Sequence, residues 1–389
     1  MTKEPATAAR RAPIRLTRAA DKDEAVRGDL SAATTHGPDL WTANDEFARV
    51  ERLTLEADGG FGAHASFAIA DYVDLPEGRG EEMDIEGLAV DEGYLWIVGS
   101  HSRTRKKPKS DENDAATVLD RLSELKDSPN RYFLGRLALL GDGDQPGSQR
   151  PARQVELDDA APARMAGALR YRKRKGNDLR ALLMKDEHLA PFMEVPAKEN
   201  GFDVEGLAVK GERVFIGLRG PVLRGWAIVV EVGVRGRGDG SLKLAKLGDG
   251  GCYRKHFLDL GGLGVRELRR HGDHVLILAG PTMDLDGPVY LYLWPSALKG
   301  DETAAVVTRD DLVLVAALPY GEGVDHPEGL ALMEDETGRV EVLILYDTPS
   351  KDRQHDDGVG LDADVFHLPE IPSESGSKKH RKKKKDDRP

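Results

Sequence analysis

The amino-acid sequence predicts an all-β protein, a single β-propeller of about six blades with three to four antiparallel strands in each. Two observations lead to this prediction. A motif with the shared core Glu-Gly-Leu-Ala occurs in nearly the same form at residues 84–90 and 203–209, and with Leu332 ending the third copy at residues 326–332. After each copy come a polar turn, an apolar β-rich run, a loop and another apolar run, with no long amphipathic helix between the units. Such repetition is typical of sheets arranged radially around a channel.

The elements can be followed in order along the chain. An apolar strand at residues 12–17 precedes the first unit, and we expect it to complete the last blade and close the ring. The six predicted units begin at Leu30, Asp84, Ala166, Asp203, Gly264 and His326, and the unit at residues 166–195 fits the pattern least well. We therefore divide the chain into a flexible N-terminus (1–11), a propeller (12–370) and a disordered basic tail (371–389). Residues 102–130 and 141–160 are predicted insertions on the rim.

Composition narrows the class of protein. The single cysteine, Cys252, excludes an internal disulfide and any cluster of cysteine ligands. The sequence contains no run of 18 apolar residues, so it predicts no membrane helix, and its start lacks a signal-peptide pattern. We expect a soluble, cytoplasmic protein.

Charge is distributed unevenly along the chain. Residues 377–389 carry eight Lys or Arg against two Asp, so a chain with a net charge of -12 has a body near -18. An acidic body disfavours nucleic-acid binding, except through the basic tail. The tail is either a solvated extension or a segment that attracts an acidic partner.

The repeated glutamates are the first candidate site residues. If the motif strand lines the channel, Glu86, Glu205 and Glu328 occupy equivalent places around it, with Arg266 as their counterpart in another unit. Converging carboxylates bind a divalent cation such as Ca²⁺ or Mg²⁺, or share a proton. Alternatively, the glutamates are structural and hold one blade to the next, since repeat architectures reproduce structural residues as well as functional ones.

Polar residues near the ends of the second strands form a second candidate set. These rim residues and Arg266 predict a funnel that recognises a small anionic ligand: Glu46, Arg103, Arg219, Arg224, Arg266 and Asp347. Ion pairing between blades is the alternative. His101 lies between two serines in a predicted rim loop and is a candidate general base, or a structural histidine.

The motif copies resemble the bacterial family known as domain of unknown function 3616. The resemblance also rests on residues 40–46, 200–208 and 216–221, and it covers nearly all of residues 12–370. It implies a propeller and no established activity. More distantly, the blades are similar to those of esterase-like phytases and of gluconolactonase and strictosidine-synthase-like propellers, which implies a channel site that hydrolyses esters or lactones, often with calcium.

The functional prediction is a propeller that binds a small anionic ligand, for example a phosphorylated metabolite, at the channel mouth. As an enzyme it would be a metal-assisted ester or phosphoester hydrolase, with the three glutamates on the cation and His101 moving the proton. The alternative is a non-catalytic scaffold that presents its rim to a protein partner. A deep, polar channel with converging carboxylates favours the first function, and a filled channel favours the second.

Overall fold

The computed structural model describes residues 4–17, 28–108, 114–157, 161–283, 285–300, 305–335 and 337–368. The described residues form an all-β propeller, as predicted, built from five sets of four antiparallel strands. The predicted basic tail, residues 371–389, lies entirely outside the described residues, and the last described strand of the propeller ends at His367.

Each blade has four strands, named in order from the channel outward. Blade 1 contains β2 (Leu30–His36), β3 (Asp39–Asn44), β4 (Arg49–Leu55) and β5 (Phe61–Ala68). Blade 2 contains β6 (Ile85–Asp91), β7 (Tyr94–Gly99), β10 (Leu134–Leu140) and β11 (Arg150–Ala152). Blade 3 contains β17 (Asp203–Lys210), β18 (Arg213–Leu223), β19 (Trp226–Gly236) and β21 (Tyr253–Leu258). Blade 4 contains β22 (Gly264–His271), β23 (His274–Gly280), β24 (Val289–Trp294) and β26 (Val313–Leu318). Blade 5 contains β27 (His326–Glu334), β28 (Val340–Asp347), β29 (Leu361–His367) and β1 (Arg10–Ile14).

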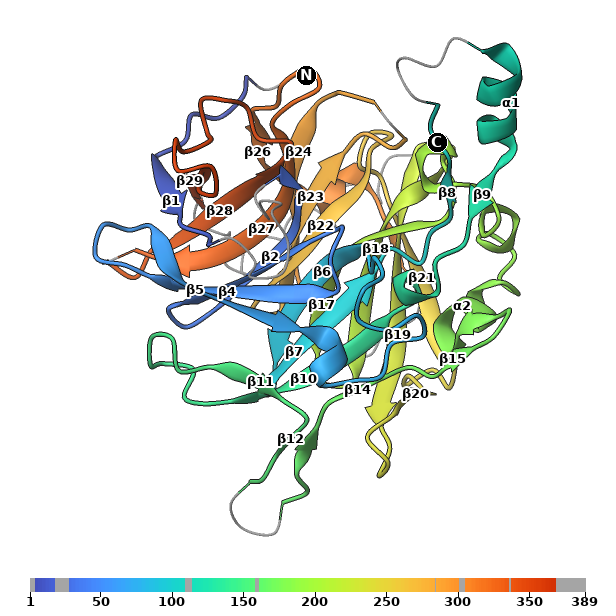
Figure 1. Ribbon diagram of the computed structural model, residues 1–389, viewed down its shortest axis with the longest axis horizontal. Coiled ribbons are helices and arrows are strands. Elements are labelled where there is room, and N and C mark those ends of the chain that lie inside the picture. The colour runs from blue at the N-terminus through green and yellow to red at the C-terminus, as the bar shows by residue number, and fades with distance from the viewer. Residues whose placement is uncertain are drawn as a thin grey trace, which may run out of the picture.

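The five inner strands form a closed ring. Each contacts the inner strands of both neighbouring blades, in the order β2, β6, β17, β22, β27 and back to β2, and Figure 1 shows them gathered near the middle of the molecule. The ring is closed by β1, which pairs antiparallel with β29 from Arg10 opposite Val365 to Ile14 opposite Leu361. This confirms the predicted closure. The strand begins inside the segment 1–11 that was predicted to be flexible, and the amide of Ala9 also donates to Val365.

The prediction of about six blades is wrong for the described residues, because the segment 166–195 forms no four-stranded sheet. Its apolar run is the helix α2 (Asp178–Leu183), which begins where the Asn177 side chain accepts a hydrogen bond from the Arg180 amide. Leu179 and Leu183 lie four residues apart on the buried face of this helix. A short apolar run does not distinguish a strand from a buried helical turn, and the N-cap decides here for the helix.

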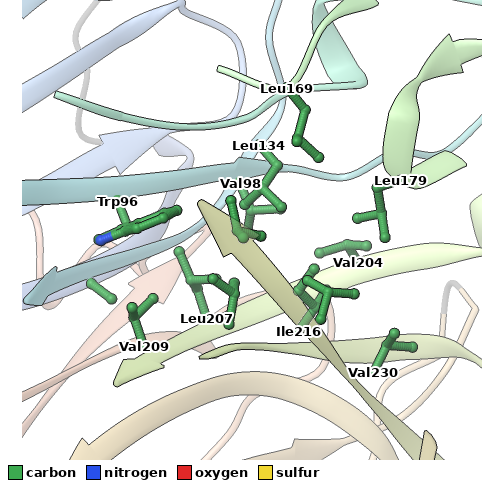
Figure 2. Packing of buried hydrophobic residues seen from close by; sticks show 14 of the residues in the cluster. Trp96, Val98, Leu134, Leu169, Leu179, Val204, Leu207, Val209, Ile216 and Val230 are labelled. Carbon is green, nitrogen blue, oxygen red and sulfur yellow. The ribbon is translucent and has the colours of Figure 1, made fainter. Parts of the chain in front are cut away.

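The hydrophobic core is divided among the interfaces between blades. Buried residues form five clusters within the described chain, and each cluster joins two neighbouring blades. Figure 2 shows the cluster between blades 2 and 3, where Trp96 and Val98 face Leu207 and Val209 and where Leu179 of α2 covers one end. Burial of one such side chain stabilises the fold by about 1.5–3 kcal/mol, so the blades depend on one another for stability.

The predicted insertions lie on the rim. Residues 102–130 contain α1 (Ala115–Ser123) between β8 (Thr104–Arg105) and β9 (Leu125–Lys126), and Figure 1 shows α1 standing away from the blades. No residue of α1 is buried, and Leu119 is 67% exposed. The remaining short strands are β12 (Gln154–Val155), β13 (Arg164–Met165), β14 (Gly167–Ala168), β15 (Tyr171–Arg172), β16 (Gly176–Asn177), β20 (Leu242–Ala245) and β25 (Val306–Val307). Neither described α-helix combines the length and apolarity needed to span a membrane.

Candidate functional site

The candidate site is built on an irregularity that all five inner strands share. In each of them the register with the second strand shifts near the start of the strand, so that one additional residue is accommodated as a bulge. The residues at this position are Ser31, Glu86, Glu205, Arg266 and Glu328. The predicted equivalence of the three glutamates and Arg266 is therefore confirmed by the register. We call this end of the channel the channel mouth.

The glycine that follows each motif glutamate lets neighbouring inner strands approach closely. A Cβ atom on Gly206 would lie 2.5 Å from the backbone nitrogen of Leu268 in the next blade, and Gly206 has a φ of +92°. A Cβ atom on Gly87 would lie 2.7 Å from the Cβ of Leu207. The Glu-Gly motif therefore combines a residue at the mouth with a close contact between blades.

Ion pairs across blades join the charged residues of the mouth. Arg266 Nε lies 3.1 Å from Glu205 Oε2, and its Nη2 donates to Glu328. Arg219 Nη1 donates to Glu205 Oε1 at 3.0 Å, and its Nη2 donates to the carbonyl of Met283. The two arginines predicted to bind a ligand are thus largely neutralised by the glutamates predicted to bind a cation.

The carboxylates of the mouth outnumber its cations on the side of blades 1 to 3. Arg131 Nη1 pairs with Asp84 at 2.8 Å, whereas Glu86 has no ion-pair partner among the described residues.

The carboxyl groups of the mouth have raised pKa values. Burial and the charges of Asp84 and Glu205 raise the pKa of Glu86 well above its usual value. Burial, together with Asp84 and Asp29, raises the pKa of Asp45 to about 8. Burial and the charge of Glu205 raise the pKa of Asp203 to about 7. Asp45 and Asp203 therefore retain protons at a pH where a free aspartate is ionised.

A pocket of about 300 Å³ opens on the side of blades 3 to 5. Its charged lining comes from Arg219, Arg266, Glu328, His326 and Asp347, with Asp286 and Lys198 at its edge. His326 Nε2 lies 2.9 Å from Asp286 Oδ1, and its Nδ1 lies 3.9 Å from Asp347 Oδ2. The carboxylate of Asp347, followed by the hydrogen bond with Asp286, raises the pKa of His326. We call this space the mouth pocket.

The three glutamates do not form a compact cation site. Within the described chain, the one group of three candidate ligands with all ligand atoms within 4.8 Å of one another is Asp335, Glu341 and His367. That group lies at the other end of the β27–β28 hairpin, and Glu341 is paired with Arg10 at 3.1 Å. At the mouth, Arg266 lies between Glu205 and Glu328 in the place where a shared cation would be needed.

Below the mouth the channel is filled by Glu267 and Arg269 of β22, which we call the channel pair. Arg269 Nη2 lies 3.1 Å from Glu267 Oε2, and Arg269 also donates to carbonyls on three other inner strands, those of Ala33, Leu88 and Leu330. Glu267 accepts from the amide of Leu207 on the remaining inner strand at 3.1 Å. Burial raises the pKa of Glu267 to about 8. The two observations that were expected to separate enzyme from scaffold are therefore both present: converging carboxylates at the mouth and a filled channel beneath.

Four predicted site residues lie away from the mouth pocket. His101 is 1% exposed, and its ring nitrogens contact the Gly99 carbonyl and the Asn177 amide at 2.8 Å each. Burial lowers the pKa of His101 to about 4, and these contacts leave no ring nitrogen for proton transfer.

The other three residues lie on the rim or at exposed loops. Arg103 pairs with Glu194 and Asp127 on the rim. Arg224 is exposed at the tip of the β18–β19 hairpin, and Glu46 is exposed after β3. Arg219, Arg266, Glu328 and Asp347 are brought together in the pocket.

The raised carboxyl pKa values predict that stability falls as pH rises. In the unfolded chain Asp45 and Asp203 lose their protons near pH 3.8, whereas the folded protein keeps them up to about pH 8 and 7. The folded state therefore binds more protons across this window, and each such group costs about 1.4 kcal/mol of stability per pH unit. We expect a lower Tm at pH 8.5 than at pH 6, measured by thermal unfolding, and a smaller decrease in Asp45→Asn.

Asp239→Asn is the control for this prediction. Asp239 is exposed, and hydrogen bonds from Ser241 lower its pKa to about 2, so it does not titrate in the window. A Tm that stays level or rises between pH 6 and 8.5 in the unaltered protein would contradict the prediction.

The chain was compared with curated proteins, solved structures and family models. No curated protein matches the chain in sequence. Among solved structures, the chain is similar to an engineered GH43 glycoside hydrolase with endo-xylanase and exo-arabinofuranosidase activity, at 9% identity and a TM-score of 0.39 over 89% of this chain and 51% of that chain. It thus spans about half the length of that protein. It is also similar to a GH43 β-1,3-galactosidase (9% identity, TM-score 0.35, 87% of this chain and 94% of that chain). A third is the PQQ-bound aldose sugar dehydrogenase of Streptomyces coelicolor (14% identity, TM-score 0.32, 93% and 100%).

Similarity at this level carries no argument about activity, since one fold supports many functions. The resemblance to phytases, gluconolactonases and strictosidine-synthase-like proteins stays a prediction. The family model described as "Protein of unknown function (DUF3616)" matches residues 29–364, which is most of the chain and includes the inner strands of all five blades. The chain therefore belongs to the DUF3616 family of proteins of unknown function.

Proposed function

We propose that the protein binds a small polar ligand with one anionic group in the mouth pocket. The observation that carries the proposal is the convergence of basic side chains from three blades on one pocket: Arg219 of blade 3, Arg266 of blade 4 and His326 of blade 5. Ion pairing across blades uses part of Arg266 and Arg219, but these side chains also line one open pocket together with His326, where a ligand can reach them.

The carboxylates of the pocket limit the charge of the ligand. Glu328, Asp286 and Asp347 share the lining with the cations, so a polyanion would meet repulsion as well as attraction. A guanidinium has five N–H donors, and Arg266 uses Nε and Nη2 on its two glutamates. The pocket therefore favours one carboxylate or phosphate, accompanied by hydroxyl or amine donors for Asp286 and Asp347.

Hydrolysis of a bound ester or phosphoester is the chemistry that this arrangement supports. A general acid must hold a proton near neutral pH, and burial with nearby carboxylates raises the pKa of Glu86 well above its usual value, the direction that this role needs. Glu86 occupies the bulge position of blade 2, which is equivalent to the positions of Arg266 and Glu328 that line the pocket. We assign Glu86 as the candidate proton donor in place of His101, with no step that passes through a metal ion.

The test is a thermal-melt screen of small carboxylates and phosphate esters, followed by calorimetric titration of any compound that raises the Tm. Charge reversal of Arg219 and Arg266 is unsuitable, because both form ion pairs with the buried Glu205 and their loss would disturb the fold. His326→Gln removes one charge-assisted contact and should weaken binding about ten-fold.

His355→Gln is the matched control, because His355 pairs with Asp362 at 2.8 Å in the same blade but lies outside the pocket. Equal affinity in His326→Gln and His355→Gln would contradict the proposal. If no compound raises the Tm, the scaffold function takes precedence, with the exposed helix α1 as the surface to examine.

A further inference from the structure

The mouth pocket has two chemically different walls. The inner wall carries the charged groups of β18, β22 and the β27–β28 hairpin. The outer wall comes from the loop after β23, with Pro281, Met283 and Leu285, and from the loop before β27, with Tyr320. Leu285 is 60% exposed and Tyr320 is 43% exposed, so two large apolar side chains meet solvent beside the charged groups.

Hydrogen bonds to Asp286 hold the two loops together. Asp286 Oδ2 accepts from the amide of Gly323 at 3.2 Å, and Asp286 Oδ1 lies 2.9 Å from His326 Nε2. The same carboxylate thus joins the loop after β23 to the loop before β27 and to the charged wall. The loop that carries Leu285 is therefore tied to the loop that carries Tyr320 and to His326.

The size of the pocket limits what the apolar wall can cover. At about 300 Å³ it lies at the lower end of the range for ligand sites, which suits a body of roughly one ring. A ligand that covers the exposed apolar surface at the edge of the pocket gains binding free energy by removing that surface from water. The flat face of a tyrosine side chain packs well against a ring.

We infer that the ligand is amphipathic, with a single carboxylate or phosphate against Arg266 and His326 and a ring-sized apolar body against Tyr320 and Leu285. This inference rests on the proposed function and adds the class of ligand. The pocket binds an aryl or cycloalkyl acid, or the corresponding phosphate monoester, in preference to the bare anion. Discrimination comes from the two loops and not from the charged wall.

The experiment compares two pairs of probes by calorimetric titration of the full-length protein: acetate with benzoate, and inorganic phosphate with phenyl phosphate. Covering roughly 50–60 Å² of apolar surface gives about 1.4 kcal/mol, or ten-fold in affinity. We therefore expect the ring-bearing member of at least one pair to bind about ten-fold more tightly. Tyr320→Ser combined with Leu285→Ser should abolish that gain and leave the affinity for the bare anion unchanged.

Leu119→Ser is the matched control, because Leu119 is 67% exposed on α1 and contributes nothing to the pocket. Far-UV circular dichroism and Tm verify that each variant is folded. If the bare anions bind and the rings add no affinity, the inference is overturned while the proposed function stands. If neither member of either pair binds, both are overturned.

Discussion

Replacement of Arg269 by methionine is expected to lower the free energy of unfolding by about 3–5 kcal/mol. Arg269 is 5% exposed, and loss of its guanidinium leaves Glu267 buried without its ion-pair partner. The variant also removes donors to the carbonyls of Ala33, Leu88 and Leu330, which lie on three different inner strands. Urea and thermal unfolding should both show the loss.

Arg270→Met is the matched control for this expectation. Arg270 is the next residue, is about one-third exposed and pairs with Asp91 at 2.7 Å on the outside of the channel. A partly exposed pair contributes about 1 kcal/mol or less. If Arg269→Met is no less stable than Arg270→Met, the channel pair does not hold the ring together.

Gly206→Ala is expected to have the second large effect. A Cβ atom there would lie 2.5 Å from the backbone nitrogen of Leu268, which is a fixed atom of the next blade. The positive φ costs about 1–2 kcal/mol for alanine, and the forced separation of the two inner strands adds about 1–3 kcal/mol. The Tm of Gly206→Ala, measured by thermal unfolding, should therefore be lower than that of the unaltered protein.

Gly211→Ala separates these two contributions. Gly211 also has a positive φ, at +62°, but an added Cβ would meet only the Glu92 side chain at 3.9 Å. It should therefore show the cost of the backbone conformation alone. Equal destabilisation by the two variants would mean that close contact between blades is not the reason for the motif glycine.

The sequence was sufficient to predict the ring and the equivalence of its motif residues. The Glu-Gly-Leu-Ala copies are local patterns, so Glu86, Glu205 and Glu328 could be aligned before any long-range contact was known. The number of blades could not be predicted in the same way. The decisive residue was Asn177, whose side chain caps the first turn of α2, so that the apolar run after it forms a helix and not a strand. A single capping residue is a weak signal in the sequence, because a short apolar run is compatible with either structure.

The partners of the site residues could not be predicted, because they come from different blades. The Arg266 contacts with Glu205 and Glu328 join residues 61 and 62 positions apart, respectively. The neighbours of His101 in sequence are serines, whereas its partner in space is Asn177.

One available signal was missed. The residue two positions before the bulge is Asp29, Asp84, Asp203, Gly264 or His326 in the five blades, and this second ring supplies much of the polar surface of the mouth. Asp45 carried no comparable repeat signal, and its role emerges only from its contact with Asp84 in the next blade.

The bulge on the inner strands has a consequence for how this protein can evolve. A bulged residue is left out of the pairing between strands, so its identity is less constrained by the sheet than that of its neighbours. Five such positions surround one opening, and they already hold a serine, three glutamates and an arginine on equivalent backbone. Selection can therefore change the chemistry of the opening on an inherited frame, with Ser31 and Glu86 free to change singly and the ion-paired Glu205, Arg266 and Glu328 changing together. A designer can use the same five positions as a set of sites.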